Sequence, residues 1–134
     1  MAAPQIERLD HIVLTVRDID VTCAFYARVL GMRVESFLPP GLTTPRISLH
    51  FGLNKINLHK AGAEFEPHAR APGSGTGDFC MITQMPIEQA AAHIRSCGVT
   101  IEEGPVKRTG AKGTLLSIYF RDPDGNLLEV SNYL

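Results

Sequence analysis

The chain carries four histidine and acidic side chains whose types suit a metal ion. They are His11, His59, Asp78 and Glu129, and each lies in a short segment with the composition of a β-strand. Two neutral imidazoles and two carboxylates suit a divalent first-row metal such as Zn, Ni, Co, Mn or Fe(II). Coordination positions left open for water or substrate would make this a catalytic rather than a structural site.

Strand alternation predicts that these side chains face away from the core. The neighbours that point the other way are apolar: Ile12, Leu14 and Val16 around His11, Ile56 and Leu58 around His59, and Leu128 and Val130 around Glu129. Helices must cover those apolar faces, so the opposite faces are free to curl around a cavity. Two simpler interpretations remain open: His11 as a polar residue on a sheet surface, and Asp78 as a strand-start cap.

The remaining pattern predicts the elements that position these residues. A helix begins at Asp18 or Asp20 and ends at Gly31, with Val21, Ala24, Phe25 and Val29 buried and Tyr26 packed at its edge. A second helix begins at Pro86 and ends at Gly98, with Ile87, Ala90, Ala91 and Ile94 buried. Strands are expected at residues 8–16, 32–38, 46–51, 55–60, 78–83, 99–102, 115–120 and 126–131, and polar loops at 61–76 and 104–113.

The order of elements repeats. Strand, helix, glycine and three strands occur twice, as module one (6–60) and module two (77–134), joined by a linker (61–76). An offset of 67 residues places His11 on Asp78. Near the end Phe51 pairs with Phe120, and from this pair His59 falls on Glu129 when one extra turn residue is allowed. We therefore expect an α+β fold of two βαβββ modules related by a pseudo-twofold axis. Their curled, open-barrel sheet would surround the metal cavity.

The segment before Glu129 has the chemistry of a turn. Asp122, Pro123 and Gly125 occupy the first, second and fourth positions that a type I turn prefers. Three basic residues lie in the expected loop at 104–113. They could hold a substrate carboxylate or phosphate, or form a solvated charged loop: Lys107, Arg108 and Lys112.

Composition narrows the class of protein. The 134 residues are enough for one domain with a proper core, and the net charge of −1 suggests neither a nucleic acid nor a membrane surface as partner. The sequence shows no run of the length of a membrane span and no signal peptide pattern. Three cysteines without a C-x-x-C pair indicate reduced thiols, so we expect a cytoplasmic protein.

Three segments resemble a known family. The segments LDHIVLTV (9–16), FY (25–26) with LGM (30–32), and DPDGNLLE (122–129) are similar to the vicinal oxygen chelate superfamily. That superfamily includes glyoxalase I, bleomycin- and fosfomycin-resistance proteins, methylmalonyl-CoA epimerase and extradiol dioxygenases. The resemblance extends from about residue 6 to 134. The segments NLH (57–59), FEP (65–67), EEGPV (102–106) and KG (112–113) resemble the small glyoxalase-domain proteins related to glyoxalase domain-containing protein 5.

The resemblance implies a function and a site. It implies that His11, His59, Asp78 and Glu129 are the metal ligands and that Glu129 is also the proton-shuttling base. His59 and Asp78 differ from the glyoxalase I set, in which these positions are often Glu and His. The implied reaction is a glyoxalase-I-like, lactoylglutathione-lyase-like isomerisation of a small vicinal-oxygen substrate through a metal-bound enediolate. Family members are commonly homodimers, so the cavity could belong to one chain or two.

Two other functions remain open. Two histidines and a carboxylate are also the set used by non-haem Fe(II) oxygenases, so a ring-cleaving dioxygenase is one alternative. The other is a metal-independent, drug-sequestering protein of the bleomycin-resistance type. Metal analysis and oxygen uptake with a catechol would separate these alternatives from a glyoxalase.

Overall fold

Two successive β-α-β-β-β units form the chain in the computed structural model, which describes residues 2–134. Their sheets have the strand orders β1-β4-β3-β2 and β5-β8-β7-β6. In both sheets the first and last strands of the unit are parallel neighbours, and the other pairs are antiparallel. The elements are β1 (His11–Val16), α1 (Ile19–Leu30), β2 (Arg33–Phe37), β3 (Arg46–Phe51), β4 (Asn54–Lys60), β5 (Asp78–Ile82), α2 (Ile87–Ser96), β6 (Glu103–Thr109), β7 (Thr114–Arg121) and β8 (Leu127–Tyr133).

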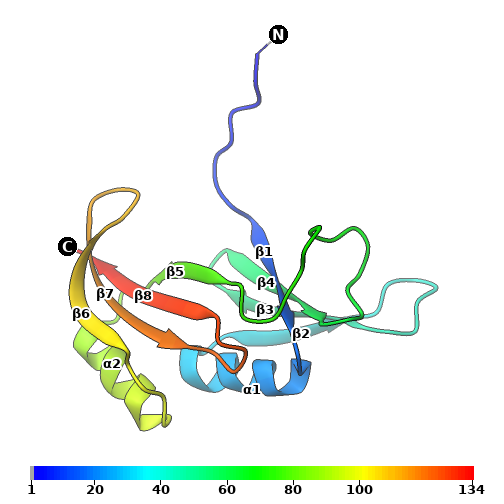
Figure 1. Ribbon diagram of the computed structural model, residues 1–134. Helices are drawn as coiled ribbons and strands as arrows, with labels where there is room; N and C mark the ends of the chain where they lie inside the picture. The colour runs from blue at the N-terminus through cyan, green and yellow to red at the C-terminus, as the bar shows by residue number, and fades with distance from the viewer. Residues whose placement is uncertain (1) are drawn as a thin grey trace.

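Both helices lie on the same side of the two sheets, so the opposite sheet faces are open (Figure 1). The core lies between helices and sheets, and its strand residues Val16, Leu58 and Leu128 are at most 1% exposed. The sheets do not close into a barrel within the chain. The predicted α+β class with two repeated modules is confirmed.

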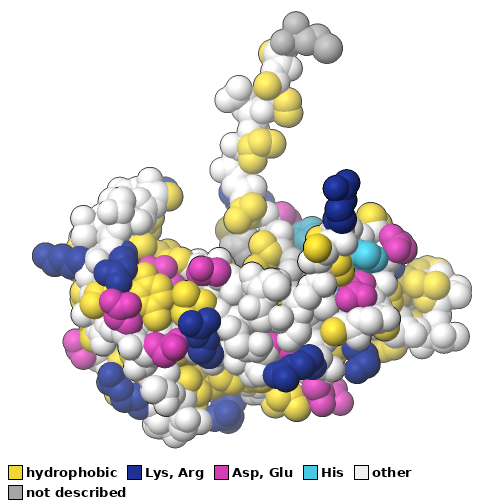
Figure 2. Space-filling model, viewed as in Figure 1, with side chains coloured by type: hydrophobic (Ala, Val, Ile, Leu, Met, Phe, Trp, Pro, Cys, Tyr) yellow, Lys and Arg dark blue, Asp and Glu magenta, His cyan; other side chains and the backbone are white. Residues whose placement is uncertain are grey.

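The segment before β1 leaves the body of the molecule. Residues 2–10 run outward from β1 on the side away from the helices, as the ribbon and the space-filling view both show (Figures 1 and 2). Ile6 and Leu9 in this segment are 82% and 74% exposed. Both apolar side chains therefore lie in solvent, outside the packed core.

The helices follow their sequence signals except in one buried stripe. Asp18 caps α1 by accepting the backbone N–H of Val21 at 3.1 Å, and Gly31 ends it with φ at 66°. The stripe predicted for α2 is confirmed, but α1 buries Thr22 and Tyr26 in place of Val21 and Ala24. Tyr26 is therefore not at the helix edge. Within residues 2–134 neither helix has the length and apolarity to cross a membrane.

The strand predicted at 99–102 is wrong, and the loop predicted at 104–113 is confirmed only for residues 110–113. Residues Glu103–Thr109 form the edge strand β6, paired with β7 through a register shift between Glu103 and Val106. Gly104 there has a φ of 108°, and a Cβ on it would lie 2.2 Å from the carbonyl oxygen of Ser117. Glycine and proline, which usually mark loops, here form a bulge on an edge strand, where a missing N–H is tolerated.

Hydrogen bonds connect the turn between β7 and β8, in the second module, to α1 in the first. The carboxylate of Asp122 accepts the Tyr26 hydroxyl at 2.7 Å, the Asn126 amide at 2.8 Å, and the backbone N–H groups of Asp124 and Asn126 at 2.9 and 3.0 Å. Burial, and then the Asp122 charge, raise the pKa of Tyr26 far above its usual value, so its hydroxyl stays protonated and donates. The predicted turn is confirmed by the hydrogen bond from the Gly125 N–H to the Asp122 carbonyl.

Asp124, in the same turn, forms hydrogen bonds to the end of β1 and to the linker. Its carboxylate accepts the Arg17 backbone N–H at 2.9 Å and the Ser74 hydroxyl at 2.6 Å, and it pairs with the Arg17 guanidinium. Burial acts to raise the pKa of Asp124, but the hydrogen bonds from Ser74 and Arg17 outweigh it and hold that pKa below its usual value.

This lowered pKa predicts a pH dependence. A depressed carboxyl pKa contributes stability above the unfolded-state value of about 3.9 and loses it as pH falls through the folded value. We expect the free energy of unfolding to drop from about pH 5 downward, and we expect Asp124→Asn to show a shallower drop over this window. Urea titrations of both proteins between pH 3 and 7 measure this. Parallel pH profiles would contradict the assignment.

Candidate functional site

Glu129 lies in β8 on the open face of the second sheet. Its direct neighbours across the strands are Cys80 in β5 and Tyr119 in β7. These three side chains and Arg108 line a cavity of about 420 Å³. The cavity is large enough for a small molecule and presents a carboxylate and a guanidinium together.

A buried pair of serines lies beneath this carboxylate. The Ser117 and Ser131 hydroxyl oxygens are 2.6 Å apart, and both residues are fully buried. The Ser131 hydroxyl donates to Glu129 Oε2 at 3.4 Å and lies 3.3 Å from Cys80 Sγ. The serines thus support one side of the Glu129 carboxylate and leave its other side toward the cavity.

The two groups beside Glu129 are protonated donors. Partial burial raises the pKa of the Cys80 thiol, and partial burial together with the Glu129 charge raises the pKa of the Tyr119 hydroxyl. Sequence reasoning missed both residues. Cys80 and Tyr119 lie on the same sheet face as Glu129. Which residues of β5 and β7 lie next to Glu129 depends on the strand register, and no sequence motif gives that register.

Of the three predicted substrate-binding residues, the structure places Arg108 beside Glu129. The guanidinium of Arg108 donates to Glu103 at 2.8 Å and to the Tyr119 hydroxyl at 3.2 Å, and it stays partly exposed. Lys107 and Lys112 do not line this cavity. Arg108 is therefore the cation of this set positioned to meet an anionic group there.

His59 lies in β4 on the open face of the first sheet, beneath the linker. The Phe65 ring packs against its ring edge-to-face at 5.5 Å, and the residue is 8% exposed. Its Nδ1 is buried and has no hydrogen-bond partner among residues 2–134. Burial, followed by the charge of Arg46, lowers the pKa of His59, which favours the neutral imidazole that metals bind. An orphaned neutral imidazole nitrogen fits a metal ligand.

The four predicted ligands do not meet within one chain. His59 and Asp78 line a common cavity of about 350 Å³, which includes neither His11 nor Glu129. His11 is bonded to Asp10 at 2.9 Å and pairs with Lys55, four residues before His59 along β4. The rise of a strand separates those two positions by about 13 Å. Among the residues that the structure describes, no three His, Cys, Asp or Glu side chains cluster as metal ligands do.

The strand register also changes the repeat. Asp78 lies two residues before Cys80, the partner of Glu129. In the first module His11 lies two residues before Val13, whose partner is Asn57. If His11 corresponds to Asp78, the counterpart of Glu129 is therefore Asn57, and His59 lies two residues beyond it on the same face. The sequence alignment paired His59 with Glu129 by adding one turn residue, because both side chains can bind a metal. The strand register pairs Asn57 with Glu129 instead.

Comparison with known proteins gives close relatives along the whole chain. Residues 8–130 match the family described as the Glyoxalase/Bleomycin resistance protein/Dioxygenase superfamily. Virulence protein STM3117 of Salmonella typhimurium is 50% identical over 129 residues, covering 96% of this chain and 86% of that protein. The crystal structure of STM3117 superimposes with a TM-score of 0.92 at 49% identity, covering 98% of this chain and 100% of the other. Glyoxalase domain-containing protein RDO1 of Mycosarcoma maydis is 48% identical over 128 residues, 96% of this chain and 69% of the relative.

A more distant relative carries an enzyme name. Lactoylglutathione lyase GLX1 of Arabidopsis thaliana is 27% identical over 141 residues. The match covers 92% of this chain but 43% of the lyase, so the chain spans less than half of that protein.

Proposed function

Because the chain belongs to the Glyoxalase/Bleomycin resistance protein/Dioxygenase superfamily, we propose that it is a divalent-metal-dependent, glyoxalase-I-like enzyme acting on a small molecule with two neighbouring oxygens. The observation that carries the proposal is the cavity in which the Glu129 carboxylate faces Arg108 and Tyr119. A base beside a cation suits proton transfer on an anionic substrate. The distant similarity to a lactoylglutathione lyase supports the same reaction class.

The metal would be held by His59 and Glu129, with Asp78, which lines the His59 cavity, as a further ligand. His11 lies about 13 Å along the sheet from His59 and would not reach the same ion. The orphaned Nδ1 of His59 supports this assignment, and the mixed nitrogen and oxygen donors suit Zn, Ni, Co, Mn or Fe(II). A bound ion would supply Lewis-acid polarisation of the substrate oxygens.

The remaining chemistry belongs to side chains of the chain. Glu129 accepts a proton from a substrate carbon and returns it to the adjacent carbon. Tyr119, protonated beside it, can donate a hydrogen bond to a substrate oxygen. Arg108 holds an anionic group at the rim of the cavity. The buried serine pair keeps the carboxylate on the cavity side of its strand.

The complete site would be shared by two copies of the chain in a homodimer. The ligand-type residues lie in two separate cavities on the open sheet faces, so a single copy provides two half-sites. Those faces also expose apolar side chains that a partner would cover, with Val13 45%, Ile82 48% and Tyr133 39% exposed. A two-fold dimer brings the first sheet of one copy against the second sheet of the other.

Metal content tests the proposal directly. Purified protein is expected to hold about one divalent ion per chain, and chelation should lower its melting temperature by several degrees because a bound ligand stabilises the folded state. His59→Ala should lose most of the metal. The control is His50→Ala, which should keep the metal because the His50 ring is already bonded to Ser48. Metal-free protein that isomerises the methylglyoxal–glutathione hemithioacetal as fast as loaded protein would contradict the proposal.

A further inference from the structure

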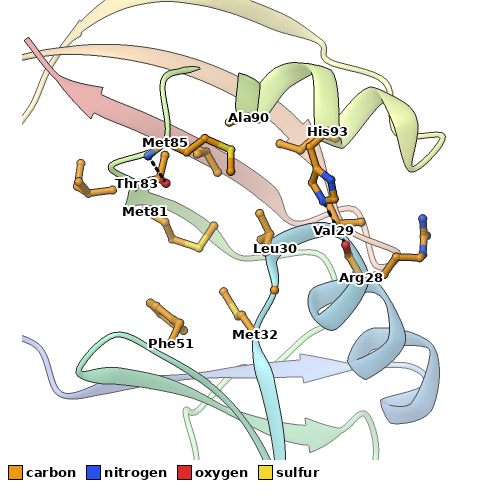
Figure 3. Close-up of a pocket in the computed structure, with 14 residues that line it drawn as sticks. Arg28, Val29, Leu30, Met32, Phe51, Met81, Thr83, Met85, Ala90 and His93 are labelled. Atoms are coloured by element: carbon orange, nitrogen blue, oxygen red, sulfur yellow. Dashed lines mark hydrogen bonds between the residues drawn. The ribbon is translucent and has the colours of Figure 1, made fainter. Parts of the chain in front are cut away.

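A second cavity, of about 390 Å³, lies between the two modules on the helix side of the sheets. Its walls come from the end of α1 and the two residues after it, the end of β3, the end of β5 with the segment that follows, and helix α2. They include Met32, Phe51, Met81, Met85, Ala90 and Ile94. Figure 3 shows the three methionine side chains and Phe51 directed toward the same space. This cavity has no residue in common with the His59 cavity. It has only Ile82 in common with the Glu129 cavity, so it is separate from the proposed site.

The cavity exists because the two modules meet at two unequal junctions. At the first, Tyr26 of α1 fills the space beside the β7–β8 turn, which runs from Asp122 to Asn126. At the second, the β3–β4 turn consists of Gly52 and Leu53, and Leu53 points into solvent at 88% exposure. Helix α2 presents Ala90 there, beside Phe51 at the end of β3. The second junction therefore has a two-residue turn and a small helix side chain where the first has a five-residue turn and a tyrosine.

The polar groups on the rim are already paired within the chain. His93 Nε2 lies 3.2 Å from the Arg28 carbonyl oxygen, and the Arg28 guanidinium donates to the Cys97 carbonyl at 2.8 Å. The Arg28 side chain runs away from the cavity (Figure 3). The Thr83 hydroxyl accepts the Met85 backbone N–H at 3.1 Å. An occupant would therefore meet apolar walls with no free charge and would itself have to be uncharged.

We propose that this cavity is a binding site for a small uncharged aromatic molecule of one or two rings. The volume of about 390 Å³ limits the occupant to one or two rings. The volume is in the range of small-molecule sites, and thioether side chains adapt to and contact aromatic edges. Met85, 47% exposed, lies at the mouth through which the molecule enters.

Indole is a suitable uncharged aromatic probe, and methionine methyl signals report on the site. With [methyl-¹³C]methionine labelling, we expect indole to shift the signals of Met32, Met81 and Met85 along a saturable curve. Ala90→Phe fills the cavity from α2 and should weaken binding at least tenfold. Ala92→Phe, on the exposed face of the same helix, should leave the affinity within twofold. Met85→Trp obstructs the mouth at a half-exposed position and provides a second variant if Ala90→Phe does not fold.

Several results would overturn the proposal. Shifts that fail to saturate, or that are equal in the wild-type and cavity-filling proteins, would mean that indole binds elsewhere. Methionine signals that ignore indole but change on dilution would mean that a second copy of the chain occupies the cavity. These outcomes are independent of metal content and of activity toward the hemithioacetal, so this site and the proposed function can fail separately.

Discussion

Asp122→Ala is expected to lower the free energy of unfolding by about 3–5 kcal/mol, a large fraction of the stability of a domain of this size. The carboxylate is 5% exposed and accepts four hydrogen bonds, including one from the fully buried Tyr26 hydroxyl. Its removal leaves those donors without a partner away from water, and each unsatisfied buried group costs about 1–3 kcal/mol. Urea denaturation followed by circular dichroism measures the effect.

The matched tyrosine variants locate this effect at the junction of the modules. Tyr26→Phe removes one donor but leaves Asp122 its other three, so we expect a smaller loss of about 1–2 kcal/mol. Tyr133 is 39% exposed, and its hydroxyl accepts the Lys112 backbone N–H. Tyr133→Phe should therefore lower the free energy of unfolding by less than about 0.5 kcal/mol. If Asp122→Ala were as stable as Tyr133→Phe, the turn would not hold the modules together.

The fold was predictable from sequence where local signals agree with the global pattern. Alternating strands, Asp18 and Gly31 at the ends of α1, and the α2 stripe each follow from spacing and capping chemistry. Tyr26 could not be placed because its burial depends on Asp122, almost a hundred residues away in the chain. The edge strand β6 was missed because Gly104 and Pro105, common in loops, form a bulge there.

The candidate site was predictable in its residue types but not in its geometry. Glu129 and His59 could be chosen by chemistry and strand face, and the structure places both on open sheet faces. Cys80, Tyr119 and Asn57 became visible through strand register, which no single strand encodes. The separation of His59 from Glu129 is a property of how the modules are arranged, and a repeat in sequence does not say whether its two copies face each other within one chain.

Glu129→Gln is expected to lower kcat/KM for the hemithioacetal by about 10²–10⁴-fold, the range for loss of a positioned general base. The substitution keeps the size of the side chain and its contact with the Ser131 hydroxyl. The neutral amide cannot accept a proton from carbon, so the loss should lie mainly in kcat. Glu88→Gln, on the exposed face of α2, should retain wild-type kinetics. Wild-type turnover by Glu129→Gln would remove the base from the proposal.

Mixing two inactive variants tests whether two copies share the site. His59→Ala and Glu129→Gln are each expected to be inactive, because every site in each homodimer lacks one essential group. In a mixed dimer one of the two shared sites carries neither substitution. Equal refolding of the two variants together should therefore restore about a quarter of wild-type activity, since half of the dimers are mixed and half of their sites are intact. A chain that builds its own complete site would give no recovery. This outcome would place His59 and Glu129 in one chain's cavity, against the two separate cavities that the structure shows.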